Sequence, residues 1–188
     1  MARLPYIDAS TASPILHEGL QALPPLNVFA MLAHAESAVV PYLSFAGVLL
    51  TQLKLDPKLR ELTILLVAAR TGAEYEWIQH VGISRALGID EAQITAIQQD
   101  DLTATCLTLD AQILLRFASQ VLEQPRADDD AFTALSDRFS PREIVEILLV
   151  IGNYHTLARI MTNLEIDLDA AIGATVIDEA QRRLNDGS

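Results

Sequence analysis

The chain has 188 residues, of which 51% are hydrophobic and 20% charged, and its 25 acidic against 13 basic residues give a formal net charge of −12. This length is enough for one compact core. Because a polyanion would bind against the overall negative field, nucleic acid is not an expected partner. The apolar fraction exceeds what an isolated small helical bundle needs, so association with further subunits is expected.

Proline and turn formers dominate residues 1–26, which we predict to be an arm wrapped around a domain of residues 27–168. Only residues 15–23 of this arm suggest a helix. The N-terminus lacks an apolar run long enough for a signal peptide or a membrane span, which favours a soluble protein without a membrane partner. Residues 169–188 form an acidic, polar tail that we expect to fray.

The first helices of the domain follow the arm. Asn27 is predicted to cap a helix that runs to about Glu36, and Pro41 marks either a second helix or a kink in the first. His34 stands among apolar and small residues. We interpret it as a core or surface histidine in preference to a catalytic one.

The centre of the domain is predicted to be a buried helix. Asp56 is a suitable N-cap, Pro57 suits the first helical position, and residues 59–69 are apolar on nearly every face. Glu61 is the exception, since it places a carboxylate on an apolar stripe. Gly72 then ends the helix, and the stretch therefore buries an acid inside the expected core.

A short acidic and aromatic segment follows this helix. Glu76 and His80 stand at positions i and i+4 of a second predicted helix, so their side chains share a face and can touch. Together with Glu61, they are candidates for a coupled set of groups that transfers protons in a poorly solvated pocket. The alternative is purely structural: Glu76 and His80 form an intrahelical pair, and Glu61 binds neighbouring backbone or arginine groups.

These residues resemble the carboxymuconolactone decarboxylase and AhpD-like superfamily, whose redox members carry Glu-Leu, an apolar helix and then C-x-x-C-x-x-x-H. Glu61 and Leu62 match the opening, and His80 matches the motif histidine. Ala73 and Glu76 stand at the two cysteine positions. The chain is therefore similar to the branch without the thiol pair, and the resemblance spans roughly residues 25 to 165.

The resemblance implies an all-α, AhpD-like domain of six to eight helices that assembles as a homo-oligomer, a trimer or hexamer. It implies a cofactor-independent lyase (decarboxylase) or isomerase that acts on a small carboxylate or lactone. In this hypothesis His80 is the general acid and base, Glu76 orients it, and Glu61 is a second proton carrier. AhpD-like peroxidase activity is the alternative within the family, and a non-catalytic binding or assembly protein is the alternative outside it.

Several helix signals follow the motif. Gly88 ends the motif helix, Asp90 with Gln93 forms a capping box, and Thr108 or Asp110 begins an amphipathic helix. Ser140 begins the last long helix, and later in that helix the polar Asn153 and His155 either line a pocket or bond within the bundle. The run of residues 128–130 favours a helix N-terminus and does not predict a metal site.

Other features exclude common classes of protein. The sequence contains no dinucleotide fingerprint, P-loop, zincin motif or serine-nucleophile elbow, so we expect no cofactor and no metal. The single cysteine, Cys106, forms no C-x-x-C pair and is interpreted as a small, half-buried hydrophobic residue. A lone cysteine is typical of a reducing compartment, which favours the cytoplasm.

Overall fold

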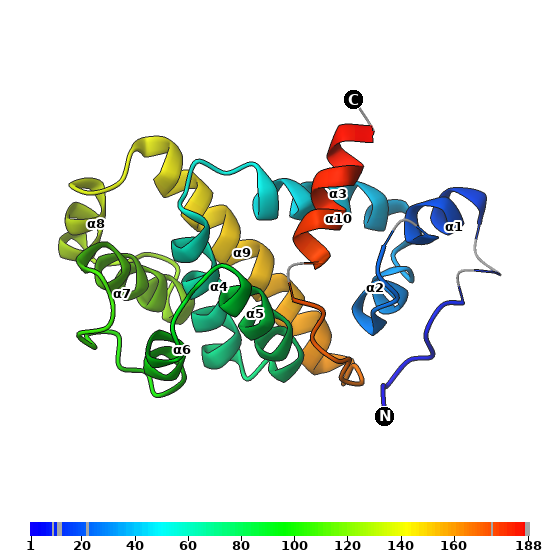
Figure 1. The fold of residues 1–188 in the computed structure, drawn as a ribbon, viewed down its shortest axis with the longest axis horizontal. Helices are drawn as coiled ribbons and strands as arrows, with labels where there is room; N and C mark the ends of the chain where they lie inside the picture. Colours follow the sequence, from blue (N-terminus) through cyan, green and yellow to red (C-terminus); the bar gives the residue numbers. More distant parts are fainter. Residues whose placement is uncertain (9, 11–12, 22, 174, 187–188) are drawn as a thin grey trace.

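Helices make up all the regular structure of the residues that this computed structural model describes, which are 1–8, 10, 13–21, 23–173 and 175–186 (Figure 1). The ten helices are α1 (Pro14–Gln21), α2 (Asn27–Leu32), α3 (Glu36–Thr51), α4 (Pro57–Thr71), α5 (Glu74–Ala86), α6 (Glu91–Gln98), α7 (Leu109–Glu123), α8 (Asp129–Ser136), α9 (Pro141–Asn163) and α10 (Thr175–Asp186). The all-α prediction is confirmed. Ten helices exceed the six to eight expected because the arm and the tail contribute α1 and α10.

Local capping signals set most helix boundaries. The Asp56 side chain accepts hydrogen bonds from the Lys58 and Leu59 amides, with Pro57 in the first turn, and α4 ends at Gly72 in the left-handed conformation (φ 66°). The predicted capping boxes are also present, at Asp90–Gln93 and Ser140–Glu143. These ends need no information from distant residues, which is why the sequence predicts them.

The beginning of α2 differs from the prediction. Leu26, not Asn27, occupies its N-cap position, without a side-chain cap. The Asn27 side chain instead donates hydrogen bonds to the Asp167 carbonyl (3.0 Å) and to the Asp169 carboxylate (2.8 Å). Asn27 therefore bonds to Asp167 and Asp169, about 140 residues away in the chain, and does not cap α2. These bonds connect α2 to the C-terminal segment. Pro41 lies inside α3, which continues through it.

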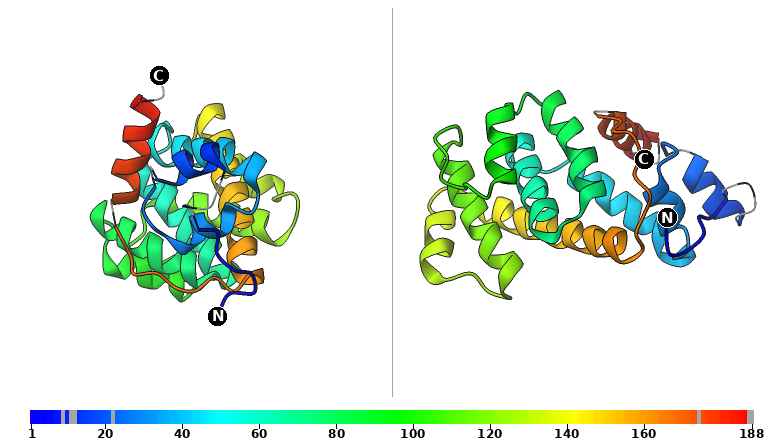
Figure 2. Two further views of the ribbon diagram at one scale, coloured as in Figure 1. Left: turned by 90° about the vertical axis from the view of Figure 1, so that its right-hand side faces the viewer. Right: turned by 90° about the horizontal axis from the view of Figure 1, so that it is seen from below.

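Helix α4 forms the centre of the domain. It packs against α5, α6, α7 and α9, and four consecutive side chains, residues 64–67, are completely buried. Burying each such aliphatic side chain contributes about 1.5–3 kcal/mol. In Figures 1 and 2, α6, α7 and α8 lie at one end of the elongated molecule, and α1, α2, α3 and α10 at the other. The second group lies on the side of α5, the helix of the motif.

The tail is anchored to the rest of the protein. Asp169 accepts hydrogen bonds from the Tyr75 hydroxyl (2.5 Å) and the Asn27 amide (2.6 Å), while Asp167 accepts one from the Tyr6 hydroxyl (3.0 Å). Helix α10 then packs against α3. The described part of the tail thus differs from the frayed segment expected from its polarity, because Asp169 finds partners in α2 and α5 and because α10 packs against α3.

Among the described residues, one helix, α9, is long and apolar enough to span a membrane by length and composition. In the fold, 44% of its most apolar window is buried, and it packs against α4, α5 and α7. The apolar side chains of α9 that face these helices are explained by packing within the domain.

Candidate active site

Glu61 lies completely buried on α4 and is the middle of a three-residue hydrogen-bonded chain. The Arg60 Nε donates to Glu61 Oε1 at 3.0 Å, and Arg60 Nη1 donates to the Leu50 carbonyl oxygen. The other carboxylate oxygen, Oε2, lies 2.7 Å from His80 Nδ1. A buried guanidinium and a buried carboxylate are thereby paired, which avoids the large cost of an isolated buried charge.

The turn at Gly72 explains how His80 reaches Glu61, 19 residues earlier in the chain. Gly72 adopts a conformation that glycine reaches without a steric penalty, and α5 then packs against α4. Since Glu61 already accepts a hydrogen bond from Arg60, it acts as acceptor toward His80 Nδ1 as well. This arrangement fixes the ring and leaves Nε2 as the nitrogen free to exchange a proton with a ligand.

An aromatic contact also positions the imidazole of His80. The rings of His80 and Tyr154 pack edge to face, with centroids 4.9 Å apart and planes at 88°. Tyr154 comes from α9, which lies against both α4 and α5. Burial, followed by the negative charge of Glu61, raises the pKa of the Tyr154 phenol, so this hydroxyl stays protonated. His80 is therefore held from two helices.

Glu76 has no hydrogen-bond partner for either carboxylate oxygen, although its side chain is buried. Burial raises its pKa well above the ordinary 4.5, and the nearby charge of Glu61 raises it further. The hypothesis that Glu76 orients His80 is wrong, because Glu61 makes that hydrogen bond. The i,i+4 spacing allows a contact, but the buried Glu61 carboxylate is the acceptor that His80 Nδ1 binds.

A cavity of about 100 Å³ lies beside Glu76 and His80. The polar side chains that line it are Tyr42, Tyr75, Glu76, Gln79, His80 and Tyr154, and most of the remaining wall is aliphatic, from α2, α3, α5, α9 and α10. The Tyr42 hydroxyl is buried without a partner, as are both oxygens of Glu76. Burial, and then the charge of Glu76, raises the pKa of Tyr42. The cavity therefore holds unused hydrogen-bonding groups in apolar surroundings.

The three predicted site residues gather at this cavity. Glu76 and His80 line it, and Glu61 lies behind His80 and acts on it through the ring. Among the described residues, no cluster of His, Cys, Asp and Glu has the arrangement of a metal site. The groups present can take a proton at His80 Nε2 and donate one from Glu76.

Other residues of interest lie elsewhere. His34 is exposed, and its Nε2 lies 2.7 Å from the Pro5 carbonyl oxygen. His155 lines a surface cleft. Asn153 is buried with both side-chain polar atoms unpaired, but it does not line the cavity. Cys106 is exposed, not half-buried as expected, because it lies in the loop before α7.

The sequence analysis missed Arg60, Tyr42, Gln79 and Tyr154. Arg60 had a usable signal, because a charged residue directly before Glu61 in an apolar helix needs a buried partner. Tyr154 lies in the polar interruption of α9 that the sequence already indicated. Tyr42 and Gln79 carried no comparable signal.

Comparisons with known proteins identify a family whose profile matches the part of the chain that carries the site residues. The sequence profile of the carboxymuconolactone decarboxylase family matches residues 41–107, which contain Glu61, Glu76 and His80. The fold is similar to that of an AhpD-core, peroxidase-related protein from Ralstonia eutropha JMP134, with a TM-score of 0.78 and 17% identity over 89% of this chain and 92% of that one. Residues 41–107 thus match the carboxymuconolactone decarboxylase family, and the chain as a whole has an AhpD-like fold.

Two other solved structures are similar in fold to this chain. A putative antioxidant defence protein AhpD from Agrobacterium tumefaciens has a TM-score of 0.62 and 23% identity over 90% of this chain and 99% of that one. The debrominase Bmp8 has a TM-score of 0.71 and 16% identity over 93% and 96% of the two chains. No curated protein matches the chain. At these identities the neighbours establish the AhpD-like fold, and the chemistry has to be argued from this chain's own residues.

Proposed function

We propose that this chain is a cofactor-independent lyase or isomerase that moves protons on a small lactone or carboxylated carbonyl compound. The observation that supports this most is the unpaired, buried Glu76 beside an imidazole that Glu61 holds in place. An unpaired buried carboxyl group is costly unless it stays protonated, and a protonated carboxyl group in a cavity is a proton donor. The match of residues 41–107 to a family named for a decarboxylase agrees with this chemistry.

The proposed roles differ from those that the sequence suggested. His80 Nε2 removes a proton from the carbon next to the substrate carbonyl, and Glu61 stabilises the imidazolium that forms. Glu76 donates its proton to the carbonyl oxygen, so that a neutral enol is formed. In the return step His80 delivers its proton to a different carbon and Glu76 recovers the enol proton. All protons are conserved, and the product is an isomer.

The lining favours the lactone over a carboxylate as the reactive group. Among the side chains that the structure describes, neither lysine nor arginine lines the cavity, and Arg60 is already engaged with Glu61 and Leu50. A buried substrate carboxylate would therefore lie near Glu61 without a cation to offset its charge. Isomerisation of a neutral carbonyl compound is the reaction that these groups support best, and decarboxylation is the second.

The test is proton exchange in D₂O with a panel of unsaturated γ-lactones, followed by ¹H NMR. Wild-type protein is expected to exchange the proton next to the carbonyl or to move the double bond. His80→Gln is expected to lose about 10²–10⁴-fold in rate, because glutamine donates hydrogen bonds but does not take up protons near neutral pH. Glu76→Gln removes the acid and is expected to lose about 10²-fold.

Thermal melting of each variant is the control. Full activity of His80→Gln, or a loss that only follows unfolding, makes His80 a structural residue. Absence of exchange on every lactone and keto acid in the panel, with wild-type protein folded, favours the non-catalytic binding or assembly protein. Peroxidase chemistry finds less support, because Ala73 and Glu76 replace the thiol pair of the motif.

We also propose that the chain forms a homo-oligomer, a trimer or hexamer, in the cytoplasm. Three neighbouring apolar side chains of α9 are exposed in the isolated chain: Val145 at 56%, Leu148 at 41% and Leu149 at 42%. Such a patch favours coverage by another subunit. Light scattering tests the assembly, and a monodisperse monomer of 20.5 kDa at micromolar concentration contradicts it.

A further inference from the structure

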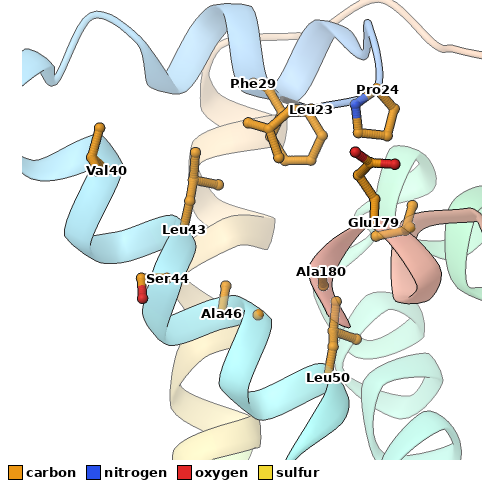
Figure 3. Close-up of a pocket in the computed structure, with 12 residues that line it drawn as sticks. Leu23, Pro24, Phe29, Val40, Leu43, Ser44, Ala46, Leu50, Glu179 and Ala180 are labelled. Atoms are coloured by element: carbon orange, nitrogen blue, oxygen red, sulfur yellow. The ribbon is translucent and has the colours of Figure 1, made fainter. Parts of the chain in front are cut away.

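A second cavity, of about 180 Å³, lies outside the site, between α3, α10 and the segment that precedes and begins α2 (Figure 3). In Figure 3, Leu43 and Leu50 of α3 face Glu179 and Ala180 of α10 across the opening, and Phe29 closes it from α2. We call this space the outer cavity, and the space beside Glu76 and His80 the inner cavity. None of the groups assigned to proton transfer lines the outer cavity.

The two cavities adjoin each other. Their shared wall consists of five side chains from α2, α3 and α10: Phe29, Leu43, Ala46, Leu50 and Val176. Ala46 is the smallest of these five residues. Because both cavities contact the same five apolar side chains, the part of a ligand that extends past the inner cavity on this side meets apolar surface.

The chemistry of the outer cavity restricts what this longer part can be. Its side-chain lining is aliphatic or aromatic apart from Ser44 and Glu179. Glu179 forms an ion pair with Arg182 (2.8 Å) on the same helix, and neither lysine nor arginine is among the described side chains that line the cavity. An anionic extension would meet the Glu179 carboxylate, and a strongly polar one would lose hydration without gaining partners. A hydrocarbon chain fits without either cost.

We propose that the outer cavity binds the hydrocarbon tail of the substrate, whose carbonyl end lies at Glu76 in the inner cavity. The substrate class is then an uncharged lactone or ketone that carries an alkyl tail. The position of the carbonyl end rests on the proposed function. The tail site itself rests on the two adjoining cavities and their apolar lining.

The experiment is calorimetric binding of γ-butyrolactone and its γ-butyl and γ-octyl derivatives to wild-type protein, with the ring-opened hydroxy acids as charged counterparts. Each buried methylene is expected to tighten binding about fourfold, so the butyl derivative binds on the order of a hundredfold tighter than the parent lactone. The charged counterparts are expected to bind at least tenfold more weakly than the lactones. Affinity that does not change with tail length overturns the proposal, as does equal affinity for the hydroxy acids.

Two variants locate the tail. Ala180→Trp narrows the outer cavity from α10, and Ala46→Phe blocks the wall shared with the inner cavity. Ala180→Trp is expected to abolish the gain from the tail while the parent lactone binds as in wild type, whereas Ala46→Phe, which also narrows the inner cavity, is expected to abolish the gain and to weaken the parent lactone. Gln181→Trp, at an exposed position of α10, is the matched control and is expected to keep the gain. An Ala180→Trp protein that melts like wild type and keeps the full gain places the tail elsewhere.

Binding and turnover separate this proposal from the proposed function. Tail-dependent binding without proton exchange supports the outer cavity and contradicts the catalytic roles. Proton exchange on short lactones with no effect of the tail supports the catalytic roles and contradicts the outer cavity as a substrate site.

Discussion

Glu146 at the N-terminal half of α9 and Glu76 on α5 are both buried, but their surroundings differ. Glu146 accepts hydrogen bonds from the Leu55 amide (2.9 Å) and Arg142 Nε (2.7 Å), whereas Glu76 accepts none. Burial alone raises the pKa of Glu146, but the bonds from Arg142 and Leu55 outweigh it and leave that pKa below the ordinary 4.5. The pKa of Glu76 moves in the opposite direction.

The difference shows how the same side chain serves structure in one region and a site in another. Each carboxylate oxygen of Glu146 accepts a hydrogen bond, one from the Leu55 amide and one from Arg142. The carboxylate therefore connects the start of α9 to the loop before α4. Around Glu76, the fold leaves donor and acceptor capacity facing a cavity. Unpaired buried groups with shifted pKa values are concentrated at functional sites. The predictions below test whether the two regions behave as differently as their contacts imply.

The largest effect on stability is expected for Glu61→Gln, on the site side of the comparison. The substitution removes the negative charge that compensates the buried Arg60 guanidinium. Removing one partner of a buried ion pair typically costs about 3–5 kcal/mol. Urea denaturation measures the loss in the free energy of unfolding. A loss below about 1 kcal/mol contradicts the pairing described for Arg60 and Glu61.

A smaller loss is expected for Glu146→Ala. This variant leaves the buried Leu55 amide without an acceptor, which costs about 1–3 kcal/mol. The proton-exchange rate per folded molecule should stay at the wild-type level, because Glu146 does not line the inner cavity. Denaturation and the NMR exchange assay on the same sample provide both values. A loss of activity as large as that of Glu76→Gln removes the distinction between the two regions.

The pH dependence of stability separates the two carboxyl groups further. Because the folded-state pKa of Glu76 is raised, the native state binds more protons than the unfolded state from pH 4.5 up to that raised pKa. The contribution of Glu76 to the free energy of unfolding is therefore fully present below pH 4.5. It is lost as the pH rises from 4.5 to the raised pKa, with a slope of at most about 1.4 kcal/mol per pH unit. Glu76→Gln is expected to flatten this decline in denaturation series across pH.

For Glu146, the pH dependence of stability is expected to have the opposite sign, and Glu146→Gln tests this in the same denaturation series. A lowered folded-state pKa contributes stability above the unfolded value of 4.5 that is lost on acidification, so this variant should flatten the acid side of the curve. An unchanged profile for Glu76→Gln means that Glu76 is ionised and solvated, and that the inner cavity is not the apolar site described.

The smallest effect is expected for Cys106→Ser. Cys106 is exposed in the loop before α7, and none of the cavities described is lined by it. Stability and exchange activity should both equal those of wild type. Reductant-dependent consumption of an alkyl hydroperoxide should be at background in both proteins. Robust consumption by wild type that disappears in the variant would identify Cys106 as a peroxidatic thiol.

The parts of the fold that the sequence predicted are those with local causes. The caps at Asp56 and Ser140 and the end of α4 at Gly72 are determined within a few residues, and the structure confirms all three. The position of Glu61 and His80 near one cavity followed from the family motif. The bond between them did not, because it depends on how α5 packs back on α4 across 19 residues.

The remaining features depend on distant segments. The sequence contains the acids of the tail, but only the fold shows that Tyr75 and Asn27 bind Asp169. The isolation of Glu76 could not be predicted either, since it results from the absence of any donor within reach. Composition suggested a frayed tail, because polar residues without known partners are indistinguishable from solvated ones.

The composition of the inner cavity wall bears on how proteins that contain the matched segment can diverge. Glu61, Glu76 and His80 all lie within the segment matched by the family, residues 41–107. Much of the wall lies outside that segment, and includes Phe29, Tyr154, Leu157 and Val176. Substitutions in α2, α9 and α10 can therefore reshape the space offered to a substrate while the proton-transfer groups stay the same. Two proteins that share the matched segment need not share a substrate.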